Sequence, residues 1–265
     1  MGKKYELTNE TREFVGRTGY RIRALRDFAD VKAGDLGGFV MSESNLEQSG
    51  NCWIYGDAMV FGYANVSGDA RVSNQAMVCD YACVSGRARV SGHAAVLCDA
   101  EVSGQACVLD YAIISGDANI TDNARVFGGA IVNEHAKVFD DACVFGQAWV
   151  LGHAWVYGEA KIHGNARVCE HAMVSDDTMI GDARVFGNAM IRDNARILGD
   201  AEVSGNAMIR DDARVFGDVI VSGDAIVSGD VISFGNAMID DLLLGYWRPA
   251  TIRDNVIVPD DVCGS

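Results

Sequence analysis

This sequence is poor in proline and lacks long apolar runs and an excess of positive charge. Its 265 residues include 2 prolines, and 22 Lys and Arg stand against 37 Asp and Glu, which gives a net charge of −15. Such a charge argues against a protein that coats nucleic acid or an anionic membrane, because both need a basic surface. The chain has no apolar run of about 18 residues and no signal-peptide core. We therefore expect a cytoplasmic protein with no nucleic-acid polymer and no membrane among its partners.

From Gly56 onward the sequence repeats in units of six residues. Position three is Ala in every unit over residues 58–172, and position five is Val or Ile in every unit over residues 60–174. One residue is missing in the unit 176–180, and the frame then resumes over residues 181–240. Chance does not sustain such a frame, so it indicates a repeat architecture.

Positions three and five dictate the local structure. Two apolar residues separated by one outward residue form a short strand with one buried face. Gly, Asp or Asn at positions one and two supply a turn, because they tolerate left-handed backbone angles or cap a turn locally. A six-residue strand and turn cannot bury its own face, so it must coil and stack on its neighbours.

Columns of like residues indicate the size of the coil. At one corner, position two recurs every 18 residues as Tyr63, Tyr81, Asp99, Asp117, His135, His153 and His171. We therefore predict an all-β fold, a single-stranded parallel β-helix with three hexads and 18 residues per coil and about ten to eleven coils. The predicted parts are an N-terminal cap at 1–49, the β-solenoid at 50–240 and a C-terminal cap or tail at 241–265.

The eight cysteines of the chain fit neither a disulfide ladder nor a metal site. None of those in the repeat has another cysteine 18 residues away, and C-x-x-C spacing is absent. We expect reduced thiols, in agreement with a cytoplasmic location, and we predict no bound metal.

Position four of each hexad points outward, and two of the three faces carry long apolar stripes there. On a monomer, stripes of this size would face water, which favours a subunit interface. We therefore expect a homo-oligomer. The predicted interface residues are Met59, Met77, Ile113, Ile131, Met173, Met190, Met208 and Ile226.

The apolar stripe changes face within one coil, and this coil carries the best candidate for a ligand site. A histidine flanked by aromatic rings can act as a base, bind an anion when protonated, or fill a subunit interface. A metal is a weaker alternative, because side chains in one column point in parallel and do not converge. The predicted ligand-binding residues are Trp149, His153, Trp155 and Tyr157, with His135 and His171 one coil to either side.

Two charged columns and the basic start of the chain leave alternatives open. The third face carries an arginine column that includes Arg71, Arg89 and Arg125, which could grip phosphates or pair with neighbouring carboxylates. The aspartates stacked at position one could bind calcium or form turns without a metal. The basic residues within 1–32 could bind an anion or form a solvated cap surface.

The V-x-G-D-A-x frame over residues 50–240 resembles the hexapeptide repeat of the left-handed β-helix superfamily. That superfamily includes acyltransferases that use acetyl-CoA or acyl-CoA, and the gamma-class carbonic anhydrases. Residues 1–75 are also similar to the YdcK-like solenoid proteins, which are labelled acetyltransferases. The matching residues are Lys4-Tyr5, Asp27-Phe28, Asp30-Val31-Lys32-Ala33-Gly34, Gly37-Gly38 and Cys52-Trp53-Ile54-Tyr55.

This resemblance implies a left-handed coil, a cyclic trimer and ligand sites between neighbouring solenoids. In the acyltransferases a histidine serves as general base, and His153 is the residue that we carry into that role. The chain also departs from both groups of enzymes. Residues 50–240 contain no inserted loop, and the histidine spacings do not match the carbonic anhydrase pattern.

Two functions of different classes are therefore open. The main hypothesis is a non-catalytic, homo-oligomeric binding or scaffold protein that captures a partner or a small anionic, nucleotide-like ligand in grooves between subunits. It requires no cofactor. The alternative is a CoA-dependent acyltransferase with His153, or a neighbour in its column, as the catalytic base and CoA or acetyl-CoA as cofactor. A purely mechanical spacer is a third interpretation.

Overall fold

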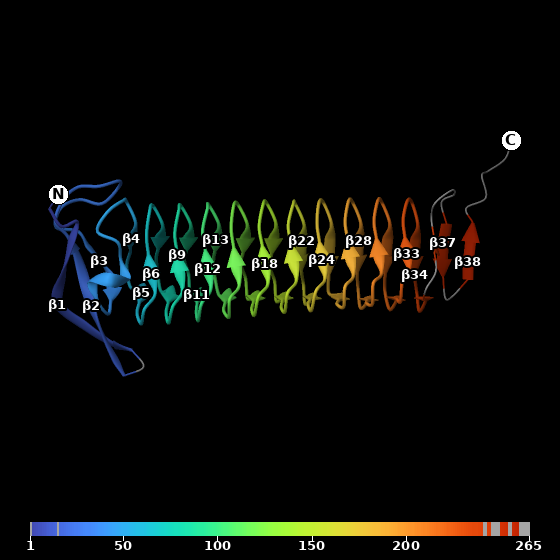
Figure 1. The fold of residues 1–265 in the computed structure, drawn as a ribbon, viewed down its shortest axis with the longest axis horizontal. Helices are drawn as coiled ribbons and strands as arrows, with labels where there is room; N and C mark the ends of the chain where they lie inside the picture. The colour runs from blue at the N-terminus through green and yellow to red at the C-terminus, as the bar shows by residue number, and fades with distance from the viewer. Residues whose placement is uncertain (1, 15, 241–242, 245–249, 254–255, 260–265) are drawn as a thin grey trace. The chain divides into compact units, whose positions relative to one another are not determined.

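The computed structural model describes most of the chain, namely residues 2–14, 16–240, 243–244, 250–253 and 256–259. The chain divides into two compact units, residues 1–134 and residues 135–265. Each unit is a parallel β-solenoid in which very short strands alternate with tight turns (Figure 1). Among the described residues, no helix is long and apolar enough to span a membrane.

The coils of the first unit have three faces, each covered by one sheet. The first face contains β3 (Leu36–Val40), β5 (Met59–Val60), β8 (Met77–Val78), β11 (Ala95–Val96), β14 (Ile113–Ile114) and β17 (Ile131–Val132). The second face contains β6 (Asn65–Val66), β9 (Cys83–Val84), β12 (Glu101–Val102) and β15 (Asn119–Ile120). The third face contains β4 (Trp53–Ile54), β7 (Arg71–Val72), β10 (Arg89–Val90), β13 (Cys107–Val108) and β16 (Arg125–Val126).

The second unit has the same three faces in the same order along the chain. Its first face contains β20 (Trp149–Val150), β23 (Arg167–Val168), β26 (Arg184–Val185), β29 (Glu202–Val203), β32 (Ile220–Ser222) and β35 (Met238–Asp240). The second face contains β18 (Lys137–Val138), β21 (Trp155–Val156), β24 (Met173–Val174), β27 (Met190–Ile191), β30 (Met208–Ile209), β33 (Ile226–Val227) and β36 (Leu243–Leu244). The third face contains β19 (Cys143–Val144), β22 (Lys161–His163), β25 (Met179–Gly181), β28 (Arg196–Leu198), β31 (Arg214–Phe216), β34 (Ile232–Phe234), β37 (Ala250–Arg253) and β38 (Val256–Pro259).

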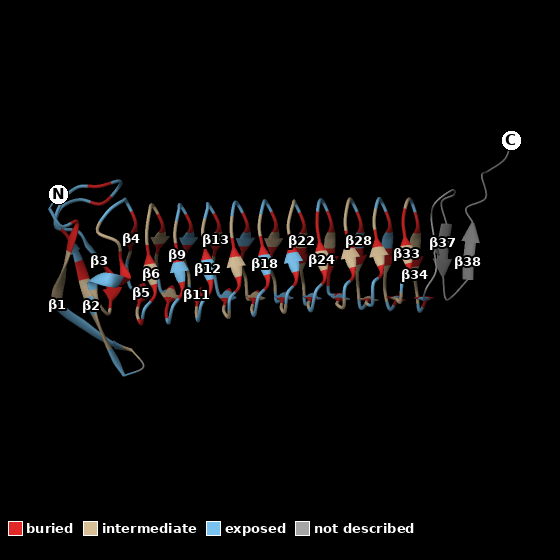
Figure 2. Ribbon diagram, viewed as in Figure 1, coloured by how far each residue is buried: buried red, intermediate tan, exposed pale blue. Residues whose placement is uncertain are grey.

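Positions three and five form the core of each unit. Side chains such as Ala142, Val144 and Ile162 are fully buried, and Figure 2 shows buried and exposed residues alternating around the coils. Parallel partners lie one coil apart, as in the pair Arg71 and Arg89, so three hexads make one coil. The predicted parallel β-solenoid with 18 residues per coil is therefore confirmed.

Each turn is made by a residue with a left-handed backbone at position one. Asp140 (φ 56°), Asp193 (φ 64°) and Asp211 (φ 61°) are examples. The carboxylate then accepts a hydrogen bond from the position-one amide of the next coil, at 3.1 Å between Asp140 and Gly158 and at 3.2 Å between Asp193 and Asp211. The stacked aspartates thus form and cap turns. Within the described ranges, no three His, Cys, Asp or Glu side chains are grouped to hold a metal.

The residue missing from the repeat belongs to a turn and not to the unit 176–180, where the sequence pattern placed it. Gly181 pairs with His163, the sixth residue of its hexad, so Gly181 is itself a sixth residue. Asp182 follows at position one with φ 61°, and Ala183 comes directly after it at position three. A Cβ on Gly181 would lie 2.3 Å from the His163 ring, so a larger residue there would force this ring to move.

The Asp182 side chain compensates for the missing residue. Its Oδ1 accepts hydrogen bonds from the backbone N–H of Asn165 at 2.8 Å and from Asn165 Nδ2 at 2.9 Å. In a complete turn, the equivalent N–H of Gln147 donates to the backbone carbonyl of Gly164 at 2.8 Å. A carboxylate therefore takes the place of a backbone carbonyl in the shortened turn.

The residues before the repeat form a hairpin and the first part of the parallel ladder. β1 (Tyr5–Phe14) pairs antiparallel with β2 (Arg17–Ala24), and β2 pairs antiparallel with β3. β3 in turn pairs in parallel with β5, so the parallel ladder begins before residue 50. A single 3-10 turn, η1 (Glu43–Asn45), follows β3. Figure 1 shows the hairpin beside these first strands.

Trp53 is the anchor of this N-terminal cap. It is 1% exposed and meets the rings of Tyr5 and Phe28 edge-on, at centroid distances of 6.2 and 5.3 Å. The buried Lys4 ammonium donates to the Cys52 carbonyl at 3.0 Å. These four aromatic and charged side chains belong to the segments that resemble YdcK-like proteins. At the other end, β37 and β38 form an antiparallel pair, whereas the predicted cap residues 245–249 lie outside the described residues.

We expect the variant Asp182→Ala to be less stable, because it leaves two donors of Asn165 without their acceptor. The loss should be about 1 kcal/mol in the free energy of unfolding, measured by urea denaturation. Asp212→Ala is the matched control, because this carboxylate accepts a bond from the side chain of Asn194. Equal urea midpoints for the two variants would contradict the compensating role.

Candidate functional site

The predicted histidine column is present as a stack of parallel rings. The rings of His135 and His153 lie 4.7 Å apart at an interplanar angle of 11°, and those of His153 and His171 lie 5.0 Å apart at 6°. All three side chains are exposed. Stacked rings point in the same direction, so they form a row of imidazoles that an anion or a hydrogen-bond acceptor can contact. The same parallel arrangement does not provide the converging ligands that a metal needs.

The aromatic residues predicted to surround His153 fall into two further contact groups. Trp149 is 37% exposed and lies under the guanidinium of Arg167, 4.8 Å from its ring centroid. Trp155 is 40% exposed and meets Phe139 edge-on at 6.2 Å. Tyr157 stacks on the same Phe139 ring at 4.9 Å. The coil therefore presents a histidine corner with a tryptophan on each adjoining face, and Tyr157 belongs to the following corner.

The predicted interface residues lie on two faces and are at least partly exposed. On the first face of the first unit, Ile113 is 36% exposed. Met59 and Met77 line a hollow of about 490 Å³ together with Phe14 of the hairpin and His93. On the second face of the second unit, the intermediate or exposed residues are Trp155, Met173, Met190, Met208 and Ile226.

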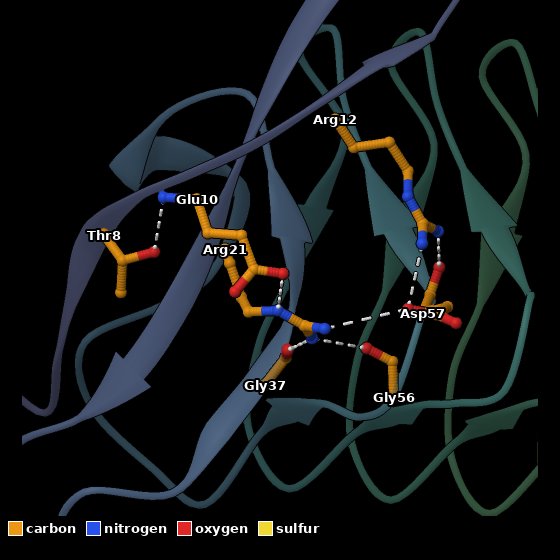
Figure 3. A network of polar contacts seen from close by, with 7 residues as sticks. All are labelled: Thr8, Glu10, Arg12, Arg21, Gly37, Gly56 and Asp57. Carbon is orange, nitrogen blue, oxygen red and sulfur yellow. Dashed lines mark hydrogen bonds and ion pairs between the residues drawn. The ribbon is translucent and has the colours of Figure 1, made fainter.

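Two arginines of the hairpin, Arg12 and Arg21, contact the first coil, and Arg21 makes more of these contacts. Arg21 Nε donates to Glu10 at 2.8 Å, and Arg21 Nη1 donates to the carbonyls of Gly37 and Gly56 at 2.8 and 3.2 Å. Its Nη2 lies 3.8 Å from the Asp57 carboxylate. Figure 3 shows these bonds converging on one side chain. Arg21 thus joins both hairpin strands to the start of the solenoid.

Other basic residues near the start of the chain also have acidic partners. Lys3 pairs with Glu43 at 2.7 Å, and Arg12 pairs with Asp57 at 3.1 Å. These ion pairs are largely exposed and therefore contribute little to stability. Several basic side chains of this segment form ion pairs within or next to the cap. These pairs favour the interpretation of residues 1–32 as a cap surface over an anion site.

A groove lies on the third face of the first unit, along the arginine column that the sequence left open as a phosphate site or a set of ion pairs. We name it the arginine groove. It has a volume of about 520 Å³ and is lined by Asp30, Tyr55, Arg71, Ser73, Arg89, Ser91, Cys107 and Leu109. Asp30 comes from the cap loop, whereas the other residues come from successive coils. The repeated segment Arg-Val-Ser at 71–73 and 89–91 was the available signal.

Asp30 and Tyr55 fix the position of Arg71 in this groove. The Tyr55 hydroxyl donates to Asp30 Oδ1 at 2.9 Å, and Arg71 Nη2 lies 3.0 Å from the same oxygen. Burial acts to raise the pKa of Asp30, but the Tyr55 hydrogen bond, a backbone hydrogen bond and the Arg71 charge together outweigh it and lower the pKa below its ordinary value. Arg71 therefore pairs with a carboxylate, which is one of the two alternatives that the sequence left open for it. That carboxylate, Asp30, belongs to the cap loop.

A family model described as YdcK Beta solenoid repeat matches residues 213–229. This match agrees with the 18-residue parallel coils of both units. The chain is a hexapeptide-repeat β-solenoid. The resemblance to the hexapeptide-repeat and YdcK-like solenoid proteins is thereby confirmed.

Among curated proteins, this hexapeptide-repeat β-solenoid is similar to the "Uncharacterized acetyltransferase YdcK" of Escherichia coli (strain K12). The two are 41% identical over 71 residues, which are 23% of this chain and 22% of the relative. The chain therefore matches about a fifth of the length of this relative.

Two solved structures are similar to the β-solenoid at low sequence identity. LpxA from Acinetobacter baumannii is 11% identical with a TM-score of 0.45, and the alignment covers 69% of this chain and 72% of that one. The UDP-N-acetylglucosamine O-acyltransferase (LpxA) from Moraxella catarrhalis RH4 is 13% identical with a TM-score of 0.35, and the alignment covers 73% of each chain.

The Tyr55 hydroxyl makes stability sensitive to alkaline pH. Burial raises the pKa of Tyr55 to about 12, and its hydrogen bond to Asp30 adds to this. In the unfolded chain a tyrosine ionises near pH 10, so above that pH proton release favours unfolding. We expect wild-type protein to lose more stability between pH 9 and pH 11 than Tyr55→Phe, as measured by urea midpoints. The exposed Tyr111→Phe is the control and should behave as wild type.

Proposed function

We propose that this β-solenoid is a homo-oligomeric binding protein, with a trimer as the favoured assembly, that captures a small anionic ligand beside its subunit contacts. The apolar column on the second face of the second unit supports the proposal. Its members pair strand to strand without interruption from Trp155 through Met173, Met190 and Met208 to Ile226. A continuous apolar stripe of this length is unfavourable in water and favourable against a second subunit.

The histidine corner borders this apolar column and is where we place the captured ligand. His135, His153 and His171 would provide positive charge when protonated. Trp149, Trp155 and Tyr157 would provide flat apolar surface, which suits a nucleotide-like ligand. Binding of this kind needs a preformed surface and no cofactor. No cysteine among the described residues belongs to a disulfide, which fits the reducing cytoplasm as the place of action.

A charge placed in the apolar column should weaken the assembly. Met190→Glu and Met208→Glu would each bury a carboxylate at the proposed contact, which is costly without a partner. We expect sedimentation equilibrium to show smaller species for both variants. Met179→Glu, the same exchange on the third face, should leave the mass of wild type unchanged. A monomeric wild type, or an equal effect of all three changes, would rule out this interface.

Acyl transfer is the second candidate function. The exposed imidazole of His153 and the acetyltransferase name of the YdcK relative favour it. CoA carries phosphates, and two cations lie beside the tryptophans, with Arg167 over Trp149 and Lys137 Nζ 5.0 Å from the Trp155 ring centroid. These residues fit a bound CoA or acetyl-CoA by charge. His153 would then take the proton from the hydroxyl or amine that attacks the acyl carbon, the thioester C–S bond would break, and the CoA thiolate would leave with a proton returned from His153.

The acyltransferase candidate makes a sharp prediction for His153→Ala. Loss of a general base lowers turnover by about 10²- to 10⁴-fold, while the CoA-induced rise in melting temperature should persist. His93→Ala is the control, because this histidine stacks on Tyr111 in the first unit. If millimolar CoA and acetyl-CoA leave the melting temperature of the wild type unchanged, acyl transfer is excluded and ligand capture remains.

A further inference from the structure

We propose that the arginine groove binds the phosphoryl group of a phosphate monoester, and that nucleoside monophosphates are the ligand class that fits it. This site goes beyond the proposed function. All of its lining residues belong to the first unit, so it needs neither the apolar column nor the histidine corner of the second unit. The following contacts carry the proposal.

Two arginine forks and two hydroxyls are repeated at the spacing of the coils. Arg71 and Arg89 are direct partners on the parallel strands β7 and β10, so their backbones lie about 4.8 Å apart. Ser73 and Ser91 follow them at the same offset and line the same groove. Planar guanidinium groups bind phosphate oxygens in pairs, and hydroxyls add further donors. The groove therefore presents donors in a two-by-two arrangement.

Arg89 is the cation that remains available. In the part of the chain that the structure describes, its side chain is exposed and takes part in none of the ion pairs. Arg71 is held in place by Asp30 through Nη1 and Nη2 at 3.4 and 3.0 Å. A guanidinium has five N–H donors, so Arg71 keeps donors for a ligand while its orientation is fixed. One arginine is thus preorganised and the other is free to close on an anion.

The local charge is positive in a chain whose net charge is −15. A second hollow of about 220 Å³ adjoins the groove, shares Arg71 and Arg89 with it, and adds Asp69 and Arg87. Together the two hollows are lined by three guanidinium groups and two carboxylates. Asp30 lies 3.0 Å from Arg71 and Asp69 lies 4.0 Å from Arg87, so the positive charge that remains unbalanced is that of Arg89. The unbalanced positive charge favours an anion.

The size and lining of the groove indicate an organic group on the phosphate. A volume of about 520 Å³ is far larger than a phosphate ion and falls in the range of small-molecule sites. Leu109 and the Tyr55 ring supply apolar surface at the groove. Asp30 can also accept a hydrogen bond from a sugar hydroxyl. A phosphorylated nucleoside satisfies the cations, the acceptor and the apolar surface together.

The test is isothermal titration of the full-length protein with AMP, inorganic phosphate and adenosine. We expect AMP to bind, phosphate to compete with it, and adenosine to bind at least tenfold more weakly. Arg89→Gln should weaken AMP binding by about 10- to 100-fold, because it removes charged hydrogen bonds to the phosphate. Arg89→Lys should restore only part of the affinity, since an ammonium group cannot bind two oxygens as a fork.

Arg196→Gln is the matched control, because Arg196 is an exposed arginine of the same column in the second unit and is followed by Leu198 instead of a serine. It should bind AMP as wild type does. Absence of AMP binding, equal binding of adenosine, or an equal loss in both glutamine variants would overturn the phosphate site. Met190→Glu separates this site from the proposed assembly, since AMP binding should survive in a dissociated chain.

Discussion

The left-handed residue at position one of every hexad is the constraint on which the rest of the structure depends. It turns the chain at each corner, and its carboxylate or backbone then bonds to the same corner of the next coil, as Asp140 does with Gly158. Because every corner turns alike, residues 18 positions apart lie directly over one another. The histidine stack, the apolar column and the arginine column all result from this registration.

The narrow core has a second consequence for function. Alanine and valine or isoleucine fill the interior of each coil without gaps that a ligand could enter, and these side chains are fully buried. Chemistry is therefore confined to the outward positions and to the cap loop that lies over them. A binding site of this protein therefore consists of outward side chains from successive coils, either alone or together with a loop of the cap.

Much of the fold was predictable because its signals are local. The alternation of Ala58 and Val60, repeated hexad after hexad, is sufficient for strands, turns and coil size. The shortened turn was misplaced because Gly181 has the residue type of a position-one glycine, and only its pairing with His163 shows that it ends the hexad. Pattern alone cannot distinguish a missing sixth residue from a missing second one.

The candidate sites were also predictable only in part. The histidine stack follows from 18-residue arithmetic, so its geometry was predictable from His135, His153 and His171. Trp149 and Trp155 lie on the two faces that adjoin the histidine corner, and a common ligand for these residues stays a prediction. The arginine column of the groove was predictable from the repeat, but the contribution of Asp30 was not, because Asp30 lies 41 residues from Arg71 in a cap loop that has no repeat from which to infer contacts.

The distance between Arg71 and Arg89 is set by backbone hydrogen bonds between neighbouring coils and not by side-chain rotamers. Gain or loss of one 18-residue coil would therefore move recognition groups apart or together in whole steps, without disturbing the core. In a solenoid of this kind, the distance between outward side chains of one column is a whole multiple of the spacing between coils. Its binding surfaces can be rearranged by duplicating or deleting coils. Globular folds lack this possibility, because each of their contacts depends on its own set of side chains.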